Sequence, residues 1–152
     1  MTVQVHLRVD RGANPSGKAI ERAAHATLSA CQVEDGEITI VLTDDSTLRK
    51  LNADHRGLDQ ATDVLSFPMG EVDPDSGLPY LGDVVISIER AGQQASAEDH
   101  TLSSELILLT VHGVLHLLGY DHASPQGKQA MWRLQADLLE SLGNDITGPA
   151  ET

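Results

Sequence analysis

Residues 101–118 constrain the fold most, because apolar side chains surround this segment on nearly every side at helical spacing. That pattern is typical of a helix buried inside a domain, so a sheet and other helices must cover it. Its main polar exceptions, Glu105, His112 and His116, are spaced to fall along one side. An unpaired polar group in such a helix costs on the order of 1–3 kcal/mol, which a bound metal ion would offset for the two histidines.

The rest of the chain predicts a small sheet around this helix. Apolar and polar residues alternate in short runs bounded by Gly, Pro and Asp, which is typical of strands. Strands are predicted at residues 3–9, 37–42, 63–67 and 83–88, and helices from Asn14-Pro15 towards Cys31, from the cap at 43–45 to 56–57, at 101–118, and from Ser124-Pro125 to Gly143. Residues 68–81 predict a surface loop that borders the site.

We therefore expect the α+β class in a single domain spanning residues 1–152, with a tail that frays from about residue 144. The sheet is expected to be mixed and four-stranded, packed with helices around the central helix that carries the histidines. The right-handed rule for crossover connections favours a parallel arrangement of the first two strands.

A third histidine follows the buried helix. His112 and His116 are four residues apart, so both rings can point at one ion. Gly119 can take a positive φ and reverse the chain, which would bring His122 to the same point. Cys31 is the only cysteine, which excludes a thiolate-rich zinc site. Three imidazoles without an evident fourth protein ligand indicate the open coordination of a catalytic zinc ion.

Charge and composition limit the choice of partner and location. The net charge of −13 is divided unevenly, with −3 in residues 1–70 and −10 in residues 71–152. A polyanion would approach the N-terminal half, where Arg49, Lys50 and Arg56 cluster, and its binding would be weak and salt-sensitive. The chain shows neither a long apolar run nor a secretion signal, so we expect a cytoplasmic protein with no membrane partner.

The histidine spacing allows one peptidase interpretation. Metzincin peptidases also place histidines at the first, fifth and eleventh positions of their motif, with glycine at the eighth. They carry Glu directly after the first histidine as the general base, whereas this chain has Gly113. Glycine cannot transfer a proton, so a metzincin-like metallopeptidase is the less favoured alternative.

The motifs together resemble the YbeY family of bacterial endoribonucleases over almost the whole chain. The matching segments are His-Gly-Val-Leu-His-Leu-Leu-Gly-Tyr-Asp-His at 112–122, Leu-Asn at 51–52 with Arg-Gly at 56–57, Thr-Asp-Val-Leu-Ser-Phe-Pro at 62–68, and Leu-Gly-Asp-Val-Val-Ile-Ser at 81–87. The loop at 69–79 lies outside the match.

The resemblance implies roles for individual residues. One zinc ion would be bound by His112, His116 and His122, and Arg56 would lie in the cleft beside it. Arg56 and His112 are the predicted catalytic positions, His112 acting first as a ligand. An arginine suits a phosphodiester because its parallel N–H groups can hold two oxygens. Arg56, Ser66 and Asp83 are the predicted substrate-binding residues, and Phe67 is expected to pack in the core.

The resemblance also implies a function, which is metal-dependent cleavage of single-stranded RNA in 16S rRNA maturation and ribosome quality control. Small-subunit ribosomal proteins and an assembly GTPase would be partners, and DNA would not. The attacking group is open between water and the RNA 2′-OH. The alternative from a different class is a ribosome-assembly factor that does not cleave and whose metal only braces the fold, although such a site should have a fourth protein ligand.

Overall fold

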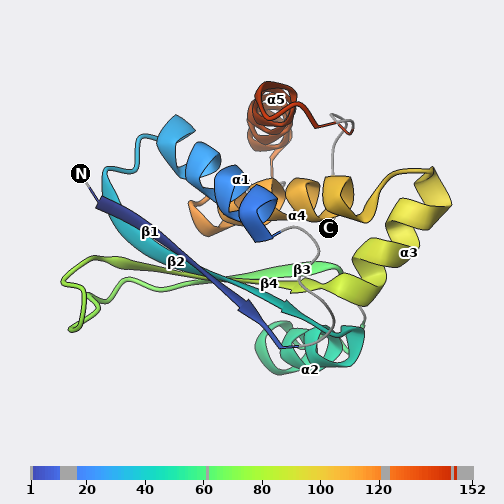
Figure 1. Cartoon of the computed structure of the whole chain (residues 1–152). Coiled ribbons are helices and arrows are strands. Elements are labelled where there is room, and N and C mark those ends of the chain that lie inside the picture. Colours follow the sequence, from blue (N-terminus) through green and yellow to red (C-terminus); the bar gives the residue numbers. More distant parts are fainter. Residues whose placement is uncertain (1, 11–16, 61, 121–123, 145, 147–152) are drawn as a thin grey trace.

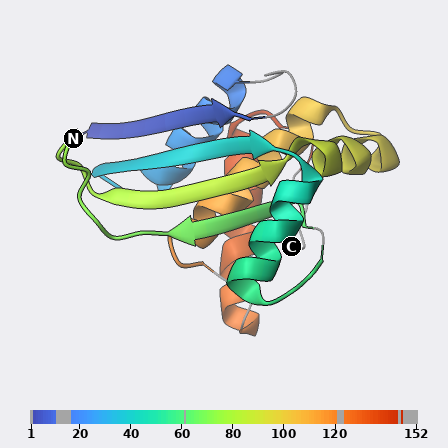
Figure 2. The same cartoon turned by 90° about the horizontal axis from the view of Figure 1, so that it is seen from below.

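A computed structural model describes residues 2–10, 17–60, 62–120, 124–144 and 146, and it confirms the predicted α+β class. The strands form one four-stranded mixed sheet in the order β1-β2-β4-β3 (Figures 1 and 2). Their bounds are β1 Thr2–Val9, β2 Asp35–Thr43, β3 Val64–Pro68 and β4 Tyr80–Ser87. β1, β2 and β4 are parallel, as predicted for the first two, and β3 is antiparallel to β4.

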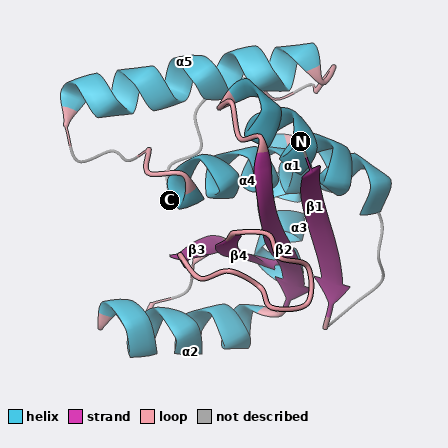
Figure 3. Cartoon of the chain, turned by 90° about the vertical axis from the view of Figure 1, so that its left-hand side faces the viewer, coloured by secondary structure: helices cyan, strands magenta, loops and turns pink. Residues whose placement is uncertain are grey.

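The helices cover the two faces of the sheet unequally. α1 (Gly17–Ala30), α4 (Leu102–Leu117) and α5 (Pro125–Ser141) lie on one face, and α2 (Asp45–Arg56) lies alone on the other (Figures 1 and 3). α3 (Ile88–Glu98) follows directly from β4 and contacts both α2 and α4. No helix in the described part of the chain is long and apolar enough to span a bilayer.

α4 is buried in the middle of the domain, which explains its apolar composition. One side, including Leu106, Leu109 and Val114, packs in the cluster that covers the sheet. The opposite side, including Val111 and Leu115, packs in a second cluster with residues of α1 and α5. A helix between a sheet and other helices has little exposed surface, so its polar residues are held in fixed surroundings.

The other face of the sheet is only partly covered. Val41, Leu65 and Val85 pack against Leu48 of α2 in a small apolar cluster. α2 crosses one end of β3 and β4 and leaves the remaining area of this face without a helix (Figure 2). A pocket on this face is lined by residues of the sheet and of α2.

Most predicted elements are present, with differences at some ends. α3 was not predicted, because its Ala, Gly and Gln residues give a weak periodic pattern directly after a strand. Its signal is Ser87, whose side chain accepts a hydrogen bond from the backbone N–H of Arg90 and caps the helix. Ser124 caps α5 as predicted. The predicted start of the first helix at Asn14-Pro15 and most of the tail beyond residue 144 lie outside the described residues.

Candidate functional site

Two of the three predicted metal ligands lie on successive turns of α4. The rings of His112 and His116 have centroids 4.6 Å apart and an interplanar angle of 76°. His112 is fully buried, whereas His116 is only partly buried at the end of the helix. Gly119 has φ +102°, as the predicted chain reversal requires. His122 lies outside the described residues, and within those residues no group of three His, Cys, Asp or Glu side chains is placed to hold a metal.

The hydrogen bond of His112 favours metal binding. Its Nδ1 lies 2.9 Å from Oε1 of Gln135, a buried residue of α5. An amide oxygen can only accept, so the imidazole must carry its proton on Nδ1. In the neutral ring Nε2 then keeps its lone pair, which is the tautomer that binds a metal through Nε2. The surroundings of His112 therefore fit a metal site.

Gly113 allows α4 to pack closely on the sheet. A Cβ at this position would lie 2.5 Å from Cγ1 of Val84 and 3.0 Å from Cγ2 of Val64, so no side chain fits without displacement of the sheet. Ser66 of β3 donates a hydrogen bond of 2.7 Å to the carbonyl oxygen of Gly113. The general base of a metzincin would have to stand at this position, and the packing leaves no room for it.

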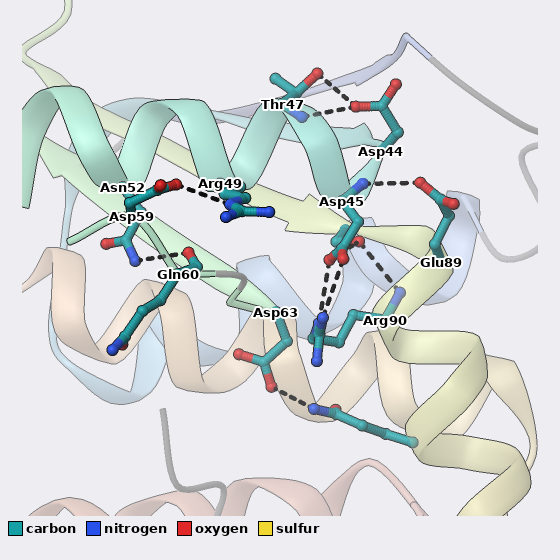
Figure 4. Close-up of polar contacts among 12 residues, drawn as sticks. Asp44, Asp45, Thr47, Arg49, Asn52, Asp59, Gln60, Asp63, Glu89 and Arg90 are labelled. Carbon is teal, nitrogen blue, oxygen red and sulfur yellow. Dashed lines mark hydrogen bonds and ion pairs between the residues drawn. The ribbon is translucent and has the colours of Figure 1, made fainter.

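Arg56 is the last residue of α2 and is exposed. Gly57 ends the helix in the left-handed conformation with φ 68°. The following turn is held by the Arg49–Asp59 ion pair at 2.8 Å and by a 3.1 Å hydrogen bond from Nδ2 of Asn52 to the carbonyl oxygen of Gln60 (Figure 4). Arg56 itself makes no ion pair with the described residues, so its guanidinium is available to a ligand.

Arg56 and the histidines approach from opposite faces of the sheet. α2 and α4 lie on different sides of the sheet, and both contact the edge strand β3 (Figure 3). β3 is thus the edge strand that both helices contact, one from each side. The cleft in which the resemblance places Arg56 beside the metal stays a prediction.

A pocket lies on the face covered by α2, next to the end of that helix. Its volume is about 460 Å³. The lining side chains are mainly apolar, with three charged or ionisable groups among them: Arg8, Val41, Leu51, His55, Phe67, Pro68, Met69, Asp83 and Val85. The rings of His55 and Phe67 meet edge to face with centroids 4.9 Å apart. The pocket thus combines aromatic rings with a few polar groups, as small-ligand sites do.

Asp83 supplies the carboxylate of this pocket. Tyr80 donates a short hydrogen bond to Oδ1 of Asp83, and its hydroxyl lies 2.6 Å from Oγ1 of Thr39. Burial and the neighbouring Asp83 raise the pKa of Tyr80 to about 12, so the phenol stays protonated as a donor at neutral pH. The carboxylate is therefore held in place and keeps a second oxygen for a ligand.

The predicted substrate-binding residues do not lie together. Ser66 faces α4, whereas Asp83 belongs to the pocket on the α2 face. Alternate residues of a strand point to opposite faces, which a motif written as a sequence does not reveal. Phe67 packs against the apolar cluster beneath α2, as predicted, and also lines the pocket.

Comparison with known proteins identifies the family. A model of a protein family described as "Endoribonuclease YbeY" matches residues 9–143. The chain belongs to the YbeY family. Curated relatives named "Endoribonuclease YbeY" include one from Anaeromyxobacter sp. (strain Fw109-5), 45% identical over 143 residues that cover 94% of this chain and 73% of the relative. Another from Persephonella marina is 40% identical over 136 residues that cover 89% of each chain.

A solved structure supports the fold of this YbeY family member. The solution structure of the Thermotoga maritima protein TM1509 aligns with a TM-score of 0.58 and 21% identity, and the alignment covers 97% of both chains. At this level of identity the likeness shows the fold alone. It agrees with the four-stranded mixed sheet and five helices described above.

Gln135 is the site residue that the sequence analysis missed. A signal was present, because Gln135 interrupts the apolar stripe that Met131, Leu138 and Leu139 form on the inner side of α5. The same reasoning that singled out the polar residues of α4 would have found it. A polar side chain in an apolar stripe needs a buried partner, and here the partner is His112.

Proposed function

We propose that this YbeY family member is a zinc-dependent, single-strand-specific endoribonuclease that acts in 16S rRNA maturation and ribosome quality control. His112, His116 and His122 would hold one zinc ion. The observation that carries the proposal is the Nδ1 hydrogen bond of His112 to Gln135, which favours the tautomer that can bind a metal through Nε2, on the helix turn next to His116. When bound, the ion would supply Lewis-acid polarisation of the phosphodiester or lower the pKa of a water molecule.

Arg56 would bind the phosphate at the reacting centre. Its guanidinium can hold two oxygens of a phosphodiester and stabilise the extra negative charge that develops during cleavage. The exposed position at the end of α2 leaves that fork accessible, while the Arg49–Asp59 pair and the Asn52 hydrogen bond hold the turn behind it. Arg56 therefore acts as a binding and charge-stabilising group rather than as a proton carrier.

The pocket beside Arg56 gives a reason for preferring unpaired RNA. An unpaired base could leave its neighbours, enter the pocket and stack on Phe67 and His55, whereas a paired base cannot. Stacking of this kind contributes about 1–3 kcal/mol per base. Asp83, held by Tyr80, would accept hydrogen bonds from the N–H groups of that base.

The charge of the chain supports action in a larger assembly. A net charge of −13 opposes the approach of free RNA, so a partner that already carries the RNA would improve binding. The small ribosomal subunit, with its proteins and an assembly GTPase, is the partner we propose. We propose the cytoplasm as the location for this activity.

The test is cleavage of end-labelled single-stranded RNA by the purified, zinc-loaded protein, compared with Arg56→Ala, His116→Ala and Lys50→Ala. Lys50 is exposed on the same helix as Arg56 and serves as the charge-matched control. Arg56→Ala should slow cleavage by about 10²–10³-fold, as loss of one charge-stabilising donor does in other enzymes. Lys50→Ala should retain most activity, because it removes only long-range attraction.

Equal cleavage by all four proteins would indicate a contaminating nuclease and would contradict the proposal. If none of the four proteins cleaves free RNA or immature small subunits, the result would favour an assembly factor without intrinsic activity. Circular dichroism of each variant shows whether its fold is intact, so that a loss of activity is assigned to the site.

A further inference from the structure

We propose that Gln135 is a positioning residue that holds His112 in the Nδ1–H tautomer and so presets its Nε2 for metal binding. This inference rests on the proposed metal site, because it explains how the chain prepares one ligand before any metal arrives. Gln135 would neither bind the metal nor touch the substrate. It would act only through His112.

The contact is built into the core of the domain. Gln135 and His112 are both fully buried, and their side chains meet between α5 and α4 at 2.9 Å. Met131 and Leu139 flank Gln135 on α5 and pack with Leu115 of α4 in one apolar cluster. Close packing on both helices fixes the two side chains, so the hydrogen bond does not depend on a mobile surface group.

The direction of this hydrogen bond matters for metal affinity. Without an acceptor at Nδ1, a neutral imidazole can place its proton on either nitrogen, and the Nε2–H form cannot bind a metal through Nε2. The binding-competent tautomer would then be only partly populated, which weakens the apparent affinity in proportion. An acceptor at 2.9 Å removes this competition and also orients the ring.

The neutral amide also suits the position. A carboxylate would accept the same proton but would add a charge in a fully buried place. A methionine would fill nearly the same volume without an acceptor. Substitution of Gln135 by glutamate and by methionine therefore distinguishes the contribution of its hydrogen bond from that of its packing.

The experiment compares Gln135→Met, Gln135→Glu and the wild-type protein, with Gln129→Met as the matched control on the exposed side of α5. The first measurement is the ¹⁵N chemical shifts of the His112 imidazole in zinc-free protein, at a pH where the ring is neutral. The second is zinc affinity, measured by competition with a chelator. Thermal unfolding of each zinc-free variant reports on packing.

We expect the wild-type protein and Gln129→Met to show the Nδ1–H tautomer. Gln135→Met should show a mixture of tautomers and bind zinc roughly 10–100-fold more weakly, the usual effect of losing an outer hydrogen-bond partner. Gln135→Glu should restore the tautomer and most of the affinity. Rescue by Glu but not by Met assigns the effect to the acceptor rather than to packing.

The inference is overturned if Gln135→Met keeps the wild-type tautomer, because Gln135 would then only fill space. It is also overturned if Met and Glu weaken zinc binding equally. If the wild-type protein binds no zinc, the proposed metal site fails, and the tautomer in zinc-free protein still decides what Gln135 does to His112. The two failures are therefore distinguishable.

Discussion

The two faces of the sheet carry different parts of the candidate site and are built differently. On the α4 face, helices cover the sheet, and His112, Gly113 and Gln135 are all buried. On the α2 face, a single helix covers one end, and Arg56 and the pocket around Asp83 are open to ligand. One face can fix ligand geometry through packing, and the other can admit a flexible substrate.

The edge strand β3 contributes residues to both faces of the sheet. Ser66 of this strand is hydrogen-bonded to α4, while its neighbour Phe67 lines the pocket on the opposite face. One strand therefore contributes a residue to the packed face and another to the open face.

The largest effect should follow His116→Ala, which removes a metal ligand at the exposed end of the buried face. His116 suits this test because it is only partly buried, whereas truncation of His112 would also leave a cavity in the core. We expect zinc affinity to fall by more than the roughly 10–100-fold cost of losing an outer-shell partner, with activity lost as well.

Thermal unfolding of His116→Ala distinguishes a catalytic from a bracing metal. If the metal is catalytic, the melting temperature of the variant should stay close to that of the wild type. A fall of many degrees would show that metal binding stabilises the fold, and it would support the assembly-factor alternative. Zinc-loaded wild-type protein is the reference for the melting temperature, and its zinc-free form shows how much of any fall comes from the metal alone.

The next effect concerns packing on the α4 face. Gly113→Ala should destabilise the protein by about 1–3 kcal/mol, because the new methyl group overlaps Cγ1 of Val84. Gly92→Ala in α3 is the matched control, since a Cβ there meets no atom within 4 Å. It should be neutral or slightly stabilising, because alanine favours a helix over glycine. Chemical denaturation measures both, and equal stability of the two variants would contradict close packing at Gly113.

A substitution in the pocket on the α2 face should change RNA binding rather than the stability of the fold. Phe67→Leu keeps apolar volume against the cluster beneath α2 but removes the aromatic ring from the pocket. We expect KM for single-stranded RNA to rise about tenfold, within the 1–3 kcal/mol that stacking of one base contributes. Val72→Ala, an exposed apolar residue of the 69–79 loop that does not line the pocket, should leave KM unchanged. A change in kcat alone would show that the ring does not bind the base.

The sequence was sufficient to predict features that depend on residues close together in the chain. The spacing of His112 and His116, the left-handed Gly119 and the cap at Ser124 all follow from local geometry, and the structure has each of them. It was insufficient where a contact joins distant segments, as in the 2.9 Å bond between His112 and Gln135. It also grouped Ser66 and Asp83 as substrate-binding residues without revealing that the register of β3 and β4 and the pleat put them on opposite faces.

The smallest effect on stability should come from substitution of Glu105, in the first turn of α4. It tests whether water is excluded from the α4 face at this end of the helix as well as at the histidines. Burial raises the pKa of the Glu105 carboxyl, and the nearby Asp63 and Glu98 raise it further against the opposing effect of His100. A raised pKa in the folded state means that the charged form costs stability at neutral pH, and this cost disappears as the carboxyl is protonated at lower pH.

Glu105→Gln is uncharged at every pH, so it should be more stable than the wild type at pH 7, by no more than about 1 kcal/mol. The advantage should shrink as the pH falls through the raised pKa towards the ordinary glutamate value of 4.5. Glu140→Gln, an exposed residue near the end of α5, is the control for removal of a surface charge. Urea unfolding at several pH values measures both variants. A constant advantage of Glu105→Gln at all pH values would mean that its gain does not come from removing a buried charge, and the α4 face would then be wetter at this end than at the histidines.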